Sequence, residues 1–193
     1  MAKISSICLF CGSRGAVAEA FRAAASDFGA RLGREGIRLV YGGGQVGLMG
    51  LAADACLGAG GKVVGIIPQH LHMREVEHKG LTELHVVSDM HSRKRMMFEL
   101  SDAFVVLPGG IGTLDELCEV LSWQTLGYHQ KPILLVDIDG FWKPFLAALD
   151  HVVAEGFAGA ELPGAFRVIP GLDAMLPALA EMPEPTSSYP ERL

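Results

Sequence analysis

Short apolar runs alternate with longer amphipathic stretches along most of this chain. Each run is bounded by turn-forming or polar residues, which is typical of buried strands in a parallel sheet. The runs predict strands at residues 4–10, 37–41, 62–67, 83–87, 103–107, 132–136 and 166–169. The amphipathic stretches, with apolar residues at helical spacing, predict helices at residues 16–34, 47–57, 90–100, 114–127, 141–153 and 172–179.

This regular alternation predicts an α/β fold with a doubly wound parallel sheet and helices on both faces. No domain boundary is evident, so we expect a single domain at residues 1–181. The remaining residues, 182–193, are rich in proline and serine, and we expect them to form a disordered tail. Residues 69–82 hold three histidines and no clear period, and they are expected to be an active-site loop, with room for a short helix.

Three of the predicted strands end in loops that contain glycine. In sheets of this kind ligands bind beyond the carboxyl ends of the strands, so the three loops can line one crevice. A glycine loop lets backbone N–H groups face a ligand, and a helix that starts there adds partial positive charge, which suits a phosphate. The candidate phosphate-binding residues are Gly12, Ser13, Gly43, Gly44, Gly109, Gly110, Ile111, Gly112 and Thr113.

The triple glycine at residues 42–44 has two interpretations. With Gly47 it fits the G-x-G-x-x-G spacing of dinucleotide sites, but the next strand ends in Ile66-Ile67-Pro68, without the acidic residue that binds a ribose. A phosphate or nucleotide loop and a purely structural tight turn stay open here. No Gly-Lys-Ser/Thr follows any of the three loops, so the chain has no P-loop.

Glu116 also has two interpretations. Thr113 and Glu116 have the spacing of a capping box, with Thr113 as N-cap and Glu116 three residues into the helix. Alternatively, a phosphate held by the loop would leave Glu116 one sugar-length away, where a carboxylate can stabilise an oxocarbenium-like sugar or activate water.

The basic residues Arg93, Lys94 and Arg95 open a predicted helix, where the helix dipole disfavours cations. A solvated basic face is one explanation. However, three adjacent residues cannot share one helix face, and Arg93 and Lys94 flank the same crevice in this topology. An arginine there can bind a phosphate or ribose hydroxyls through two hydrogen bonds.

Composition narrows the function further. The chain has 193 residues, a formal net charge of −6 and half of its residues apolar, which argues against nucleic-acid or membrane partners. No apolar stretch reaches membrane-spanning length, and the first residues read as a strand rather than a signal peptide. Four cysteines do not make a disulfide framework, so we expect a cytoplasmic protein. His70, His72 and His78 lack metal-site spacing, and we expect neither metal nor cofactor.

Residues 108–116 read P-G-G-I-G-T-L-D-E and resemble the P-G-G-x-G-T-x-x-E signature of the LOG ("lonely guy") family, the cytokinin riboside 5'-monophosphate phosphoribohydrolases. The resemblance extends over residues 7–157. It includes residues 10–13 (F-C-G-S), residues 41–44 (Y-G-G-G), residues 81–84 (L-T-E-L) and the Arg93-Lys94 pair.

This resemblance implies a Rossmann-like fold, a homodimer, and hydrolysis of the N-glycosidic bond of an AMP-type nucleotide to free base and ribose 5-phosphate. It implies Arg93 and Glu116 as the catalytic pair and a phosphate site at residues 110–113. Glu75, Lys94 and Ser122 fall at substrate-contact positions. Arg95 stands where the family often has a small residue, and Ser122 where it often has threonine.

Alternatives from other classes remain. Related Rossmann-like proteins use a P-G-G-x-G-T loop to hold phosphate without catalysis, including molybdenum-cofactor carriers. A broader purine or pyrimidine nucleotide nucleosidase is a third possibility. Some relatives bear a "lysine decarboxylase" label, but the sequence shows no motif for a pyridoxal phosphate site. The preferred base, prenylated or plain adenine, stays open.

Overall fold

A single parallel sheet organises the molecule. The computed structural model describes residues 4–72 and 77–186. Its strands are β1 (Ser6–Phe10), β2 (Arg38–Tyr41), β3 (Val63–Pro68), β4 (Glu83–Val87), β5 (Ala103–Val106), β6 (Ile133–Val136) and β7 (Arg167–Ile169). They lie in the order β4-β3-β2-β1-β5-β6-β7, and every neighbouring pair is parallel. The predicted parallel sheet is confirmed.

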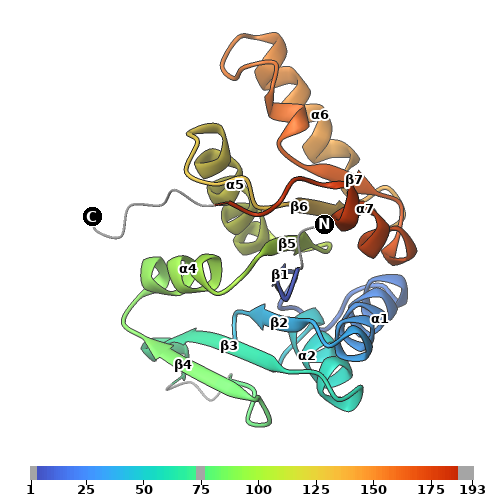
Figure 1. Cartoon of the computed structure of the whole chain (residues 1–193), viewed down its shortest axis with the longest axis vertical. Helices are drawn as coiled ribbons and strands as arrows, with labels where there is room; N and C mark the ends of the chain where they lie inside the picture. Colours follow the sequence, from blue (N-terminus) through green and yellow to red (C-terminus); the bar gives the residue numbers. More distant parts are fainter. Residues whose placement is uncertain (1–3, 73–76, 187–193) are drawn as a thin grey trace.

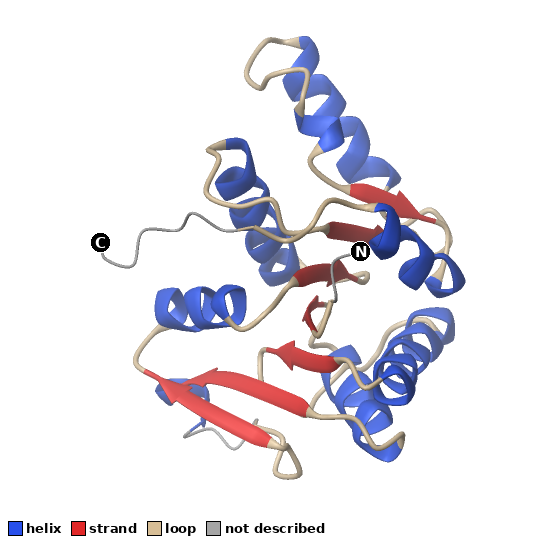
Figure 2. Ribbon diagram, viewed as in Figure 1, coloured by secondary structure: helices blue, strands red, loops and turns tan. Residues whose placement is uncertain are grey.

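Helices cover both faces of this sheet (Figures 1 and 2). Helices α1, α2 and α7 pack on one face, and α4, α5 and α6 pack on the other. The bounds are α1 (Glu19–Glu35), α2 (Leu48–Gly58), α3 (Gln69–His72), α4 (Met90–Glu99), α5 (Ile111–Thr125), α6 (Lys143–Ala154) and α7 (Met175–Glu181), with 3-10 turns η1 (Leu162–Gly164) and η2 (Leu172–Ala174). This arrangement confirms the doubly wound α/β class.

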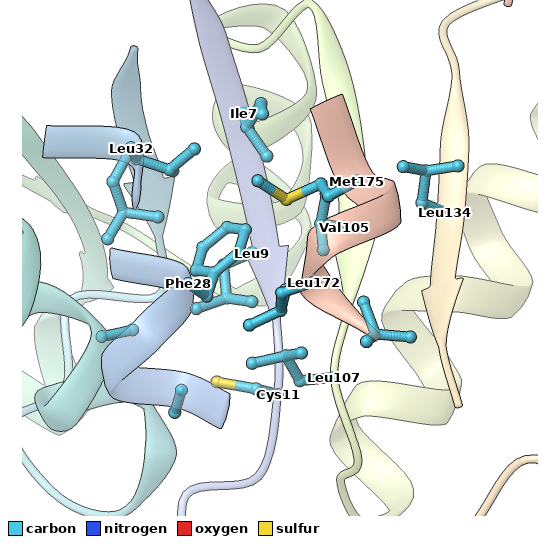
Figure 3. Packing of buried hydrophobic residues seen from close by; sticks show 14 of the residues in the cluster. Ile7, Leu9, Cys11, Phe28, Leu32, Val105, Leu107, Leu134, Leu172 and Met175 are labelled. Atoms are coloured by element: carbon cyan, nitrogen blue, oxygen red, sulfur yellow. The ribbon is translucent and has the colours of Figure 1, made fainter. Parts of the chain in front are cut away.

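The core has one layer on each side of the sheet because successive side chains of a strand point to opposite faces. Ile7 and Leu9 of β1 join the layer beneath α1, while Cys8 and Phe10 join the layer beneath α4 and α5. Figure 3 shows the first layer, in which η2 and α7 pack against the central strands through residues that include Leu172 and Met175. The central strands are buried on both sides, as the continuous apolar runs indicate.

The chain reverses direction across the sheet beside β1. It runs outward from β1 to β4, returns through α4 to β5 on the other side of β1, and then runs outward to β7. The segments after β1 and β5 therefore lead to helices on opposite faces, α1 and α5. In such sheets this switch point opens a crevice at the carboxyl ends of the strands.

Most predicted elements lie within three residues of the observed bounds, with differences at helix ends. The predicted helix at 172–179 is the 3-10 turn η2 followed by α7. Within the predicted loop at 69–82, residues 69–72 form α3, and residues 73–76 lie outside the described part of the chain. Residues 187–193 of the predicted tail also lie outside it, so the disordered tail and the domain limit stay predictions. Among the described residues, no helix combines the length and apolar character needed to cross a bilayer.

Helices α1 and α2 pack closely because α1 has glycines at the contact. A Cβ added to Gly29 would overlap the backbone of Ala52 and come within 3.0 Å of Cys56 N. We therefore expect Gly29→Ala to lower the free energy of unfolding by about 1–3 kcal/mol, although alanine ordinarily stabilises a helix interior by about 1 kcal/mol relative to glycine. Urea unfolding followed by circular dichroism measures the change.

The matched control is Gly58→Ala at the end of α2, where an added Cβ meets nothing within 4 Å. That variant should be as stable as the wild type or more so. Equal stability of the two variants would contradict the close packing at Gly29.

Candidate active site

Helix α5 follows β5 after the loop at residues 107–110, with Gly110 as its N-cap. Thr113 is therefore the third helical residue and Glu116 lies in the second turn, so the predicted capping box is wrong. The Thr113 side chain is buried and packs against Gly109, where only a glycine leaves room for it. Because Gly110 is the N-cap, no side-chain hydrogen bond caps the start of α5. The N–H groups of residues 110–113 therefore lack acceptors within the helix and face the crevice end of the sheet.

The loops after β1 and β2 lie against this helix start. Gly12 N–H donates to Pro108 O over 3.1 Å, and an added Gly12 Cβ would lie 3.4 Å from Gly109 Cα. Leu48 N–H donates to Gly12 O over 3.0 Å. Gly47 has a φ of +73°, and a Cβ there would collide with the Ser13 backbone. The structure thus brings the three predicted glycine loops together at one edge of the sheet.

Arg93 and Glu116 meet at this edge. Arg93 Nη1 lies 3.4 Å from Glu116 Oε1, and each side chain is 10% exposed. Arg93 Nε donates to Ile66 O over 3.2 Å. The guanidinium also lies over Gly42, where a Cβ would overlap Nη2. The solvated-face explanation is therefore wrong for Arg93, which is a buried cation held by β3, the β2 loop and α5.

Burial governs the protonation of Glu116. Burial raises the pKa of this carboxyl from its ordinary 4.5 to about 7, against the opposing effect of Arg93. Removing a carboxylate from water disfavours its charge more than one cation at 3.4 Å restores it. Glu116 can therefore hold or release a proton near neutral pH, which is the property expected of a catalytic acid or base.

Lys94 neutralises the other carboxylates of this helix. Its Nζ lies 3.1 Å from Asp115 Oδ2 and 3.1 Å from Glu119 Oε1. Burial lowers the Lys94 pKa, but the hydrogen bonds to Glu119 and Asp115 outweigh it, and the pKa lies above the ordinary value. The acidic residues beside a candidate anion site are thus each matched by a cation of α4, so the helix start keeps its attraction for a phosphate.

Comparison with known proteins decides the family. Residues 49–179 match the family described as "possible lysine decarboxylase". The chain is 47% identical over 153 residues to the cytokinin riboside 5'-monophosphate phosphoribohydrolase of Rhodococcoides fascians, covering 79% of this chain and 77% of that one.

It is 48% identical over 151 residues to the rice enzyme of the same name, LOG, covering 78% of this chain and 62% of the rice protein. The chain belongs to the LOG family.

The fold also occurs in solved structures of proteins outside the LOG family. The molybdenum cofactor carrier protein of Chlamydomonas reinhardtii superposes with a TM-score of 0.70, covering 93% of this chain and 98% of the carrier. Its sequence identity is 20%, so this likeness concerns the fold alone and supports the Rossmann-like class.

Ser122 and Glu75, which the LOG resemblance implies as substrate contacts, stay predictions. Ser122 lies in a groove of about 390 Å³ between α5, α6 and the segment 157–162, and the residues that line this groove do not include Arg93 or Glu116. Glu75 lies outside the described residues. The described residues hold no group of three or more metal-binding side chains.

Sequence reasoning missed Asp89, which positions the helix of Arg93, and the contact between Asp54 and His78. Asp89 caps α4 by accepting from Ser92 N–H over 2.8 Å, and it thereby fixes the helix that carries Arg93. An aspartate directly before the amphipathic stretch was the available signal. Asp54 contacts His78 at 2.9 Å from a distant helix, and no local pattern announces that pair.

The raised pKa of Glu116 predicts a pH-dependent cost to stability. Because the folded pKa, about 7, exceeds the ordinary 4.5, the stability that protonated Glu116 provides is complete below pH 4.5 and is lost as pH rises through 7. Glu116→Gln stays neutral, so its unfolding free energy should gain about 3 kcal/mol relative to the wild type between those limits. Urea titrations at a series of pH values measure this difference.

The control is Glu99→Gln, which alters an exposed carboxylate at the end of α4. Its stability should follow the wild type across the same range. A Glu116→Gln curve parallel to the wild type would contradict a buried, raised-pKa carboxyl.

Proposed function

We propose that this protein hydrolyses the N-glycosidic bond of a nucleoside 5'-monophosphate and releases the free base and ribose 5-phosphate. The observation that carries this proposal is the buried pair of Arg93 and Glu116 beside the open start of α5. The relatives at 47% and 48% identity are named as enzymes of this reaction, acting on cytokinin riboside 5'-monophosphates.

The phosphate is the group that we propose to anchor the substrate. The N–H groups of residues 110–113 and the positive end of the α5 dipole attract it. Gly12 and Ser13, at the contact between the β1 and β5 loops, complete one wall, and Gly43 and Gly44 form the next. Lys94 balances Asp115 and Glu119, so these carboxylates do not repel the phosphate.

The sugar then lies against Glu116. Ionised Glu116 stabilises positive charge on the sugar as the bond between C1' and the base nitrogen breaks. The base leaves with the bonding electron pair and takes up a proton. Water adds to C1' and gives a proton to Glu116, whose pKa of about 7 suits that acceptance, and Glu116 passes this proton to the released base. Arg93 holds the carboxylate and contacts the nucleotide.

A molybdenum-cofactor carrier shares this fold, but a carrier function does not explain why Arg93 and Glu116 are buried together. A buried arginine and carboxylate cost desolvation energy, and holding a phosphate needs only the helix start. A broader nucleotide nucleosidase differs only in the base accepted. Incubation with AMP, isopentenyladenosine monophosphate, GMP and CMP, with free base measured from each, separates these possibilities and shows whether a prenylated or a plain adenine is preferred.

We also propose a homodimer in the cytoplasm that needs neither metal nor cofactor. Exposed apolar residues on and beside α5 and α6 support self-association: Ile111 is 83%, Leu126 65% and Phe157 87% exposed. All four cysteines are free thiols, which suits a reducing compartment.

Substitutions at the pair test the mechanism. Glu116→Gln and Arg93→Ala should each lower kcat/KM for AMP at least about 100-fold, because each removes a charge that the transition state needs. Free adenine is measured by chromatography. Arg95→Ala, which removes the exposed cation of the same helix, should retain wild-type activity. Full activity of Glu116→Gln would refute the mechanism.

Charge on the apolar surface tests the dimer. Leu126→Asp and Phe157→Asp should convert the dimer to a monomer, because a carboxylate in an apolar interface loses its hydration. Sedimentation equilibrium measures the mass. Val86→Asp, at an exposed valine on the edge strand β4, is the control and should stay dimeric. A wild-type protein that is monomeric at all concentrations would rule out the dimer.

A further inference from the structure

The segment from Glu77 to Gly80 is fastened to the β2 loop. His78 N–H donates to Gly43 O over 2.9 Å. The His78 ring is buried between two further partners: Nδ1 accepts from Gly80 N–H over 3.0 Å, and Nε2 lies 2.9 Å from Asp54 Oδ1. Because Nδ1 accepts, the ring proton is on Nε2 and is donated to Asp54. This fixes the backbone of the segment beside the glycine loop.

Glu77 is the residue that this fastening holds against the loop. It forms an isolated antiparallel bridge with Gly44. Its side chain is 13% exposed, yet Oε2 is buried and has no hydrogen-bond partner among the described residues. His72 Nδ1 is also buried without such a partner, and it lies 3.9 Å from Glu77 Oε2. Two buried polar atoms thus face each other at a separation too long for a hydrogen bond.

Such an arrangement can bind one further polar group. Buried carboxylate and imidazole atoms are normally satisfied, because burial without a partner costs free energy. One oxygen or nitrogen atom placed to the side of the 3.9 Å gap can lie within hydrogen-bond distance of both. A carboxylate oxygen accepts a hydrogen bond, and a histidine ring nitrogen donates or accepts one. Together they can bind a group that carries a donor and an acceptor.

The loop that Glu77 contacts also contacts Arg93, one of the two proposed catalytic residues. Arg93 covers Gly42, and Glu77 bridges Gly44, two residues further along the same loop. Glu77 bridges the loop that follows β2, on the half of the sheet formed by β2, β3 and β4, whereas α5 follows β5 on the other half. A nucleotide whose phosphate lies at α5 would direct its sugar hydroxyls or its base toward Glu77.

We propose that Glu77, with His72 beside it, is a further substrate-binding residue that accepts a hydrogen bond from the nucleotide. The proposal rests on the function proposed above. The donor is an O–H of the ribose or the exocyclic N–H of the base; the hydroxyl can also accept a hydrogen bond, whereas the exocyclic amine only donates.

Glu77→Gln tests this because it keeps the shape and removes the charge. The KM for AMP should rise roughly tenfold, as for loss of a hydrogen bond to a charged acceptor, while kcat changes less than about threefold. The same measurements with 2'-deoxy-AMP, 3'-deoxy-AMP and IMP identify the donor. The preference for AMP over the analogue lacking that donor should shrink in Glu77→Gln.

Glu83→Gln is the matched control. Glu83 also lies beside a histidine, with His85 Nε2 3.5 Å away, but its side chain is 56% exposed at the start of β4, at the amino end of that strand. Its KM values and substrate preferences should equal those of the wild type. Thermal unfolding of both variants shows whether the fold is retained.

Unchanged KM and unchanged preferences in Glu77→Gln would overturn the proposal. A loss of stability that raises KM for every analogue by the same factor would also overturn it, because it would show a structural role. If the wild type releases no base from any nucleotide, calorimetric titration with AMP still decides the point: Glu77→Gln binds AMP roughly tenfold more weakly if the proposal holds and equally if it does not.

Discussion

The contact between Arg93 and Glu116 is the interaction on which the site depends. It joins α4, which carries the chain back from the β4 edge, to α5, which follows β5 on the other side of β1. This buried ion pair therefore links the two helices that flank the switch point. Arg93 is fixed by its hydrogen bond to Ile66 O and by its packing over Gly42, which has no side chain. The Glu116 carboxylate beside it is therefore held in a defined place.

This pair is not explained by stability alone. A buried ion pair repays its desolvation only partly, and the raised pKa of Glu116, about 7, shows that burial outweighs the attraction to Arg93. Lys94, which is bound to two carboxylates, shows the opposite balance: its pKa lies above the ordinary value. The adjacent cations of α4 thus have different roles. Lys94 keeps the start of α5 attractive to anions, and Arg93 holds the Glu116 carboxylate, whose charge can change.

The sequence predicts the fold well because buried parallel strands and amphipathic helices each leave a periodic signal, and the glycine loops show which edge binds ligands. The site is predicted less completely. The glycines at 109, 110 and 112 read as a loop up to Thr113, whereas the burial of Thr113 against Gly109 lets the helix begin at Ile111. The burial of Arg93 depends on Ile66 and Gly42, and the position of Glu77 depends on its bridge to Gly44. These are contacts between distant segments that no local pattern encodes.

The central claim is that the phosphate anchors a nucleotide whose glycosidic bond is then hydrolysed beside Glu116. The most direct measurement compares AMP with adenosine as substrates of the wild-type protein, following adenine and the sugar product together. We predict equal amounts of adenine and ribose 5-phosphate from AMP, with kcat/KM for adenosine lower by at least about 100-fold, because binding energy from the phosphate is used at the reacting carbon. Equal rates on the two substrates, or no adenine from AMP or any other nucleoside monophosphate, would contradict the claim.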